Sequence, residues 1–141
     1  MPAAMRGAVD DTPAHLIDVL PTLLAAAGAP CPTRNGEDDV QPPEGVSLLP
    51  ALRGGDVTRQ QPICFEHHGN LGIRDGRWKM VSAYRKNKPI SWELYDMRSD
   101  RTELHDLAAA QPERVRELSA KWQSWADRVG VQPWPIPPKP R

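Results

Sequence analysis

The stretch FEHHGNLGIRDGRWKMV, at residues 65–81, decides the fold of this chain. Within it, the dipeptide Asp75-Gly76 separates two apolar segments, LGI before it and WKMV after it. Glycine supplies the positive φ that a two-residue hairpin turn requires. The pattern therefore predicts that a strand leaves the polar EHHGN loop, turns at Asp75-Gly76 and returns from Trp78.

Apolar segments on either side extend this hairpin into a small sheet. Residues alternate between its two faces from Trp78 onward, as in a half-buried antiparallel strand. The polar run at 85–88 then makes the turn into the last strand. We expect strands at 63–66, 71–74, 78–84 and 92–95, and hence an α+β fold with a small antiparallel sheet of about four strands.

A C-terminal helix should cover this sheet. Pro112 suits the first helical position, the helix runs to about Arg128, and Gly130 stands just beyond its end. If the ring of Trp78 is fully buried under the helix, Trp78→Ala should cost about 3 to 5 kcal/mol. The expected apolar face consists of Val115, Leu118, Trp122, Trp125 or Ala126, and Val129.

A shorter helix is expected near the N-terminus, from about residue 17 to 27, ended by Gly28. Pro21 is tolerated only in the first turn, so the helix must begin at Asp18 or just before it. Asp18 then serves as a cap or as a first-turn acid favoured by the helix dipole. The apolar stripe of this short helix needs a sheet to lie on; it consists of Leu20, Leu23, Leu24 and Ala27.

Between the helix and the strands, residues 29–44 are expected to be a loop. Residues 45–54 are expected to form a short helical turn, capped by Ser47 and ended by Gly54.

Composition excludes several classes of partner. Lys plus Arg and Asp plus Glu number 18 each, so there is no net field to attract nucleic acid or an anionic membrane surface. No apolar run approaches the ~20 residues that a membrane-spanning helix needs. Cys31 and Cys64 form no CxxC pair, so neither a disulfide framework nor a structural zinc site is expected.

The candidate binding residues are His67, His68 and Asn70, which cluster where a strand meets a loop. A histidine pair there could donate hydrogen bonds to an oxyanion or polarise a leaving oxygen. The alternative is turn chemistry, because Gly69 and Asn70 are turn formers and strand side chains alternate, so that one histidine points away from the other.

The remaining polar residues suggest structural roles. His15 is a possible helix cap or a surface residue, and His105 is expected in a solvated loop. Neither has a second histidine at the spacing of a metal site. Arg74 could approach an anionic substrate, but a cross-strand pair with Glu93 or an exposed position is the alternative.

Three motifs between residues 66 and 108 carry a family resemblance: E-H-x-G-N, x-x-x-R-D-G-x-W-K-x-V, and W-E-L-Y-D-x-x-x-D-R-T-E-x-x-D-L-A. Together they resemble the C-terminal part of arylsulfatase-type sulfatases, members of the alkaline-phosphatase-like superfamily. HLIDVLPTLL at 15–24 and GVSLLP at 45–50 resemble the same family in the same order.

The resemblance implies hydrolysis of sulfate esters. In that family a formylglycine hydrate attacks sulfur, and a calcium ion held by acidic and Asn residues clamps the sulfate oxygens. Pro32 directly follows Cys31, so this chain lacks the C-x-P-x-R sequence of the formylglycine site. No catalytic residue and no metal ligand is therefore assigned to this chain. The resemblance implies that His67, His68 and Asn70 line the substrate pocket.

We expect residues 1–58 to be the C-terminal remnant of an α/β catalytic domain with its connecting loop, 59–132 the C-terminal sulfatase subdomain, and 133–141 a Pro-rich tail. The expected function is to supply pocket wall and scaffold to a sulfatase, without activity in isolation. One alternative is a non-enzymatic truncated remnant or binding module. Another is the tail of a related phosphodiesterase or phosphonate hydrolase.

Overall fold

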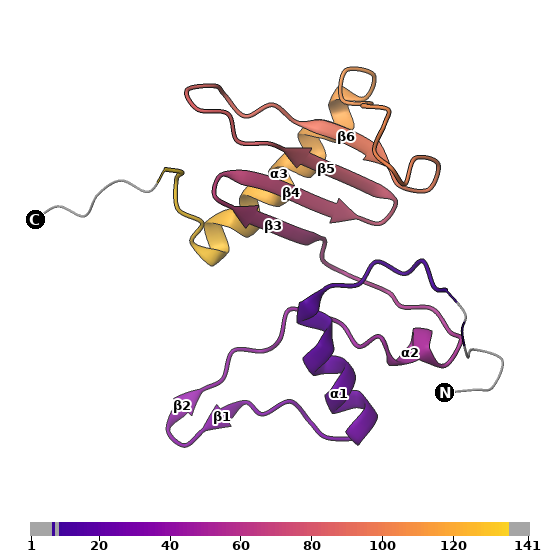
Figure 1. Cartoon of the computed structure of the whole chain (residues 1–141). Helices are drawn as coiled ribbons and strands as arrows, with labels where there is room; N and C mark the ends of the chain where they lie inside the picture. The colour runs from indigo at the N-terminus through magenta and orange to yellow at the C-terminus, as the bar shows by residue number, and fades with distance from the viewer. Residues whose placement is uncertain (1–6, 8, 136–141) are drawn as a thin grey trace, which may run out of the picture. The chain divides into compact units, whose positions relative to one another are not determined.

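The computed structural model describes Gly7 and residues 9–135, which form two compact units (Figure 1). The first unit ends at Gln60 and the second begins at Gln61. Within the described residues, no helix is both long and apolar enough to cross a membrane. The part of the predicted Pro-rich tail from residue 136 onward lies outside the described residues.

The second unit contains a four-stranded antiparallel sheet, in the order β3-β4-β5-β6. This confirms the predicted sheet. The side chains of Cys64, Ile73, Met80 and Leu94 lie level with one another across it. The four strands are β3 (Ile63–His67), β4 (Asn70–Asp75), β5 (Trp78–Ser82) and β6 (Glu93–Asp96).

Three strands differ from their predicted ranges by one residue at one or both ends, and β5 differs by two. β5 ends at Ser82, not at residue 84, because the Ser82 hydroxyl accepts a hydrogen bond from the backbone N–H of Ser91 (3.3 Å) and the chain leaves the sheet there. The turn into β5 is also one residue later than expected. Asp75 still pairs with Trp78, so the turn residues are Gly76 and Arg77, and Gly76 has the expected positive φ of 54°.

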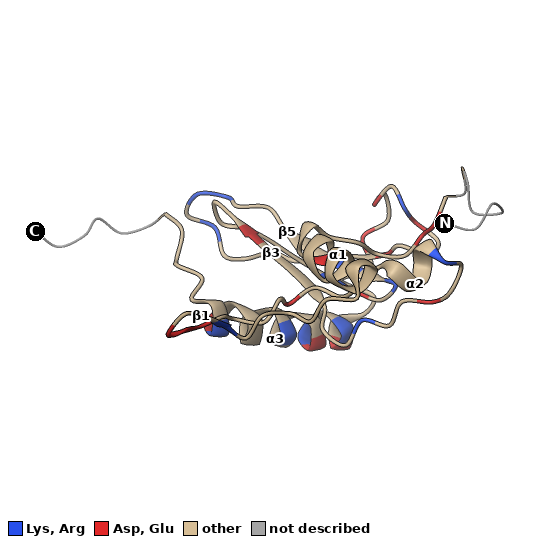
Figure 2. Cartoon of the chain, turned by 90° about the horizontal axis from the view of Figure 1, so that it is seen from below, with Lys and Arg blue, Asp and Glu red and all other residues tan. Residues whose placement is uncertain are grey.

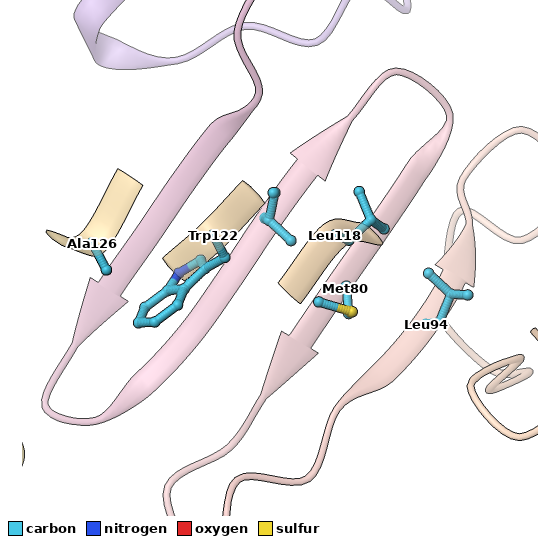
Figure 3. Close-up of a cluster of buried hydrophobic side chains, with 6 residues drawn as sticks. Met80, Leu94, Leu118, Trp122 and Ala126 are labelled. Carbon is cyan, nitrogen blue, oxygen red and sulfur yellow. The ribbon is translucent and has the colours of Figure 1, made fainter. Parts of the chain in front are cut away.

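Helix α3 (Pro112–Val129) lies across one face of this sheet (Figure 1). The indole N–H of Trp122 donates to the Phe65 carbonyl at 3.0 Å, so this buried polar atom is satisfied. Val129, predicted on the buried face, is exposed, because Gly130 turns the chain at φ 73° and Val131 packs against the core instead. The core, drawn in Figure 3, consists of Ile73, Met80, Leu94, Leu118, Trp122 and Ala126.

The ring of Trp78 packs against the edge of this core and is only half-buried. The guanidinium groups of Arg77 and Arg114 lie over it, at 4.9 and 5.5 Å from the ring centroid. The condition of full burial is therefore not met, and the cost of Trp78→Ala should fall below the range stated for a fully buried ring.

The fully buried Leu118 offers a direct test of the helix–sheet packing. It is 1% exposed, and Leu118→Ala should lower the free energy of unfolding of the second unit by about 2 to 5 kcal/mol through lost burial and a residual cavity. Urea unfolding followed by tryptophan fluorescence measures this, because all five tryptophans lie in the second unit. Val129→Ala, at a 44% exposed position of the same helix, is the control. Equal losses in the two variants would contradict the packing.

In the first unit, the 3-10 turn η2 (Leu16–Asp18) leads into helix α1 (Val19–Ala27), close to the predicted start. The predicted helical turn is shorter than expected: α2 (Leu49–Leu52) begins two residues after Ser47, whose hydroxyl accepts from the Leu49 N–H at 3.2 Å. The prediction of a plain loop at 29–44 is wrong. Two short exposed strands, β1 (Arg34–Asn35) and β2 (Asp38–Asp39), pair there around Gly36 at φ 65°.

Asp18 holds this unit together. Its side chain is 0% exposed, and its carboxylate accepts hydrogen bonds from the backbone N–H groups of His15 (2.8 Å) and Val46 (2.9 Å) and from the Arg59 guanidinium (2.5 Å). His15 caps η2, which is one of the two roles expected for it. Asp18 is thus more than a local cap, because two of its partners come from distant parts of the sequence.

Gly45 allows this approach. A Cβ atom at this position would lie 2.1 Å from the carbonyl oxygen of Ile17, so no other residue fits without a shift of the backbone. The close contact lets the next residue, Val46, reach the Asp18 carboxylate. By contrast, α1 buries none of its own residues, and Leu16 just before it is 81% exposed.

The partners of Asp18 predict an acid-sensitive first unit. Burial raises the pKa of Asp18, but the hydrogen bonds from Arg59, Val46 and His15 outweigh it and hold the pKa below its ordinary value. Because the pKa is lowered in the folded state, this stabilisation is present above about pH 4, the unfolded value, and is lost as pH falls through the lowered folded pKa. Asp18→Asn should cost about 3 kcal/mol at neutral pH and flatten the acid dependence.

Amide hydrogen exchange of α1, measured from neutral pH to about pH 3, tests this, since the first unit contains no tryptophan. Asp38→Asn, an exposed change in β2, serves as the control. If Asp18→Asn and Asp38→Asn gave the same protection and the same pH dependence, the buried carboxylate would not stabilise the unit.

Candidate functional site

The predicted binding residues lie at the tip of the β3–β4 hairpin. His67 ends β3 and pairs with Asn70, the first residue of β4, so that only His68 and Gly69 remain as turn residues. Both have positive φ, 51° and 79°, which a two-residue turn of type I′ requires. Histidine enters this region more readily than most residues. The EHHGN segment is therefore a two-residue turn, shorter than the loop expected from the sequence.

The two histidines lie side by side. The ring centroids of His67 and His68 are 4.1 Å apart, and the ring of Trp134 stacks on the other side of His68 at 4.6 Å. The expectation that one histidine points away from the other is wrong, because His68 is a turn residue and strand alternation does not apply to it. Both histidines are exposed to solvent.

Gly69 fits between two aromatic rings. A Cβ atom here would lie 2.9 Å from Trp134 Cδ1 and 2.9 Å from Tyr84 Cδ2. The N–H of Gly69 also donates to the Glu66 carboxylate at 2.8 Å, which fixes the turn. Glycine is thus required here both by its φ and by the space available.

Asn70 connects the hairpin to the loop after β5. Its amide nitrogen donates to the His67 carbonyl at 2.9 Å, and its amide oxygen accepts from the backbone N–H of Tyr84 at 3.0 Å. Both ends of the amide therefore have backbone partners. Sequence reasoning did not identify Tyr84 and Trp134 as part of this cluster. The only feature of the sequence that could have indicated them is an aromatic residue within a polar segment.

Arg74 is not brought to this cluster. It lies level with Lys79 and Tyr95 across the sheet, whereas Glu93 lies level with Val81, so the expected Arg74–Glu93 pair does not follow from the register. Burial lowers the pKa of the half-buried Arg74. Glu93 instead accepts from the Tyr95 hydroxyl at 2.8 Å, and this hydrogen bond, together with burial, raises the pKa of Tyr95 to about 12.

The two other histidines lie elsewhere. His15 belongs to the first unit. His105 lies in an exposed loop after β6, as predicted, with its Nδ1 3.6 Å from the Asp100 carboxylate. Backbone N–H groups of His105 and Leu104 donate to that carboxylate and lower the pKa of Asp100.

The family resemblance implies a calcium ion, which would need several oxygen donors close together. Among Gly7 and residues 9–135, no three His, Cys, Asp or Glu side chains lie close enough to hold a metal ion. Calcium prefers six to eight oxygen ligands. The described side chains therefore do not fit a calcium ion on their own.

Comparison with known proteins identifies the family. The chain is 29% identical over 126 residues to an uncharacterized sulfatase of Schizosaccharomyces pombe, which covers 87% of this chain and 23% of that protein. It is 33% identical over 122 residues to arylsulfatase K of Bos taurus, covering 77% of this chain and 21% of that protein. The chain belongs to the sulfatases. No family model matches it.

The structure agrees with this assignment. A solved structure from work on glycosaminoglycan metabolism by Bacteroides thetaiotaomicron superposes with a TM-score of 0.56 at 28% identity, over 76% of this chain and 24% of that one. The chain thus spans about a quarter of the length of the relatives it matches and corresponds to a C-terminal part of a sulfatase. The antiparallel sheet with its C-terminal helix is the fold of this region.

The crowding at Gly69 can be measured against a matched glycine. Gly130 has nearly the same φ, 73°, but a Cβ atom there would meet nothing within 4 Å. Gly130→Ala should cost about 1 to 2 kcal/mol of unfolding free energy from backbone strain alone. Gly69→Ala should cost more and should also shift the Trp134 indole signal in NMR spectra, because the new methyl group displaces the ring. If both variants lost the same unfolding free energy and the Trp134 indole signal did not shift, the contact between Gly69 and Trp134 would be contradicted.

Proposed function

We propose that the parent protein hydrolyses sulfate esters and that this chain supplies a wall of its substrate pocket, with His67, His68 and Asn70 at the pocket. The observation that carries the proposal is the hairpin tip, where two exposed imidazoles stand side by side on a rigid turn. Imidazole N–H groups donate hydrogen bonds to oxyanions, and a sulfate ester presents three outer oxygens to such donors. Sulfatase relatives support the reaction class.

The three residues have different proposed roles. His67 and His68 bind substrate directly, since their rings are exposed. Asn70 positions them, because its amide is already engaged by the backbone of His67 and Tyr84. Rigid donors of this kind lose little conformational entropy on binding. The proposal assigns no nucleophile and no metal ligand to this chain.

The substrate is proposed to be a sulfated saccharide. A structural neighbour comes from a study of glycosaminoglycan metabolism, and glycosaminoglycans are sulfated polysaccharides. The formylglycine nucleophile and calcium of the family are proposed to come from the part of the sulfatase that this chain does not cover. The exposed apolar residues of α1, among them Leu20 and Leu23, support a scaffold role against such a part.

The proposal predicts that the chain alone is catalytically silent. Incubated with 4-nitrophenyl sulfate and calcium, it should release no more nitrophenol than a His67→Ala/His68→Ala double variant does. Activity is expected in a chimera in which this chain replaces the C-terminal part of the Bacteroides thetaiotaomicron relative. In that chimera the double variant should raise KM for a sulfated saccharide about tenfold with a smaller change in kcat, as expected for lost ground-state binding.

Arg98→Ala is the control in the chimera, because Arg98 is exposed and follows β6 at the other end of the sheet. If the double variant and Arg98→Ala gave the same kcat/KM, the hairpin would not be part of the pocket. Turnover by the isolated chain above that of the double variant would also contradict the proposal.

The coding sequence upstream separates the proposal from its rivals. An in-frame C-x-P-x-R sequence preceded by two aspartates identifies a part of an active sulfatase. Stop codons throughout favour a truncated remnant, and a different nucleophile region favours a phosphodiesterase or phosphonate hydrolase.

A further inference from the structure

A turn rich in positive charge lies between β5 and β6. It comprises residues 85–88 and is called the cationic turn here; the N–H of Lys88 donates to the Arg85 carbonyl at 3.0 Å and closes it. The side chains of Arg85, Lys86 and Lys88 are all exposed. Within the part of the chain that the structure describes, none of the three forms an ion pair.

The cationic turn lies at the same end of the sheet as the β3–β4 turn (Figure 1). Figure 2 shows its basic residues as a blue loop beside the sheet. Tyr84, which directly precedes it, connects the two features: its N–H donates to the Asn70 amide, and its ring touches Gly69. The start of the cationic turn is therefore held beside the β3–β4 turn by a hydrogen bond and a packing contact.

Two aromatic rings accompany these charges. Tyr84 is 38% exposed and Trp134 is 37% exposed, and both lie against Gly69. Single exposed aromatic residues are common on protein surfaces. Here, however, two aromatic rings and two imidazoles lie together at one turn, and three cations follow Tyr84 directly in the sequence. Exposed aromatic rings offer a large apolar surface to a ligand.

We propose that Tyr84, Trp134 and His68, together with the cationic turn, bind a sulfated saccharide. The flat rings pack against the C–H face of a sugar, and the guanidinium and ammonium groups form charge-assisted hydrogen bonds with sulfate oxygens. The inference rests on the proposed function, and it adds a subsite that holds a part of the saccharide without reacting with it. Binding there needs neither the nucleophile nor the metal of the family.

A long nucleic acid is a poorer match for this surface. The chain has equal numbers of acidic and basic residues, so only this patch attracts a polyanion. A nucleic-acid site normally follows the backbone with a longer basic groove. A saccharide a few units long fits three neighbouring cations and two rings better.

The test measures binding to the full chain by calorimetry and by the indole N–H signal of Trp134. The probes are a chondroitin 6-sulfate tetrasaccharide, the same tetrasaccharide without sulfate, and a single-stranded DNA of similar charge. The sulfated probe should bind at least about tenfold more tightly than the desulfated one, because charge-assisted hydrogen bonds are the stronger ones. It should also shift the Trp134 signal.

Variants then separate the parts of the site. The triple variant Arg85→Gln/Lys86→Gln/Lys88→Gln should weaken binding about tenfold or more, and Trp134→Ala about fivefold through the lost ring surface. Arg85, Lys86 and Lys88 are exposed, so their substitution should preserve the fold. Tryptophan fluorescence of the buried rings checks the fold of every variant, including Trp134→Ala. Arg98→Gln, a matched exposed cation at the other end of the sheet, should leave affinity unchanged.

Three results would overturn the inference. One is that the sulfated probe does not bind, and another is that Arg98→Gln and the triple variant lose the same affinity for it. The third is DNA that binds as tightly as the sulfated probe with an affinity that Trp134→Ala does not change. A failure of the subsite can be distinguished from a failure of the proposed function. If the chimera hydrolyses sulfated saccharides with a His67/His68-dependent KM while the chain shows no such binding, the proposed function stands and the subsite does not.

Discussion

The packing of α3 on one face of the sheet is the constraint on which the rest of the second unit depends. Because β3 to β6 are antiparallel neighbours in chain order, the β3–β4 turn and the β5–β6 loop must lie at the same end. α3 then crosses the sheet, and Gly130 ends it so that Trp134 reaches that same end. Strand order thus brings the first two segments to one end of the sheet, and the helix–sheet contact adds the third.

The two ends of this sheet differ in how their charges are compensated. At the end of the sheet that carries the β4–β5 turn, Arg77 pairs with the buried Asp96, and Lys121 of α3 donates to Asp75 at 2.7 Å. The outer edge of β6 is also closed, since the Leu94 N–H donates to the Asp106 carboxylate at 2.9 Å. At the opposite end, the cations of residues 85–88 have no such partners among the described residues. Charge that is not used for stability is available for binding.

Local signals in the sequence predicted most of the fold. Pro112 and Gly130 bounded α3, and Gly76 marked a hairpin. Proline fixes its own φ, and glycine adopts the positive φ that most other residues avoid, so each acts without distant partners. The partners of Asp18 were not predictable, since Val46 and Arg59 are 28 and 41 residues away and no periodicity records such contacts. Trp134 was assigned to a tail for the same reason. Its contact with His68 depends on how α3 ends.

The E-H-x-G-N motif can now be divided by what each residue does in the turn. Glu66 accepts from the Gly69 N–H, Gly69 is required by its φ and by the neighbouring rings, and Asn70 joins two backbone segments. These three positions are explained by turn geometry alone. The imidazoles of His67 and His68 are not, since their rings contact only each other and Trp134 among the described aromatic groups. The proposed recognition at this hairpin therefore assigns direct contacts to the two imidazoles and leaves the other three residues to hold the turn.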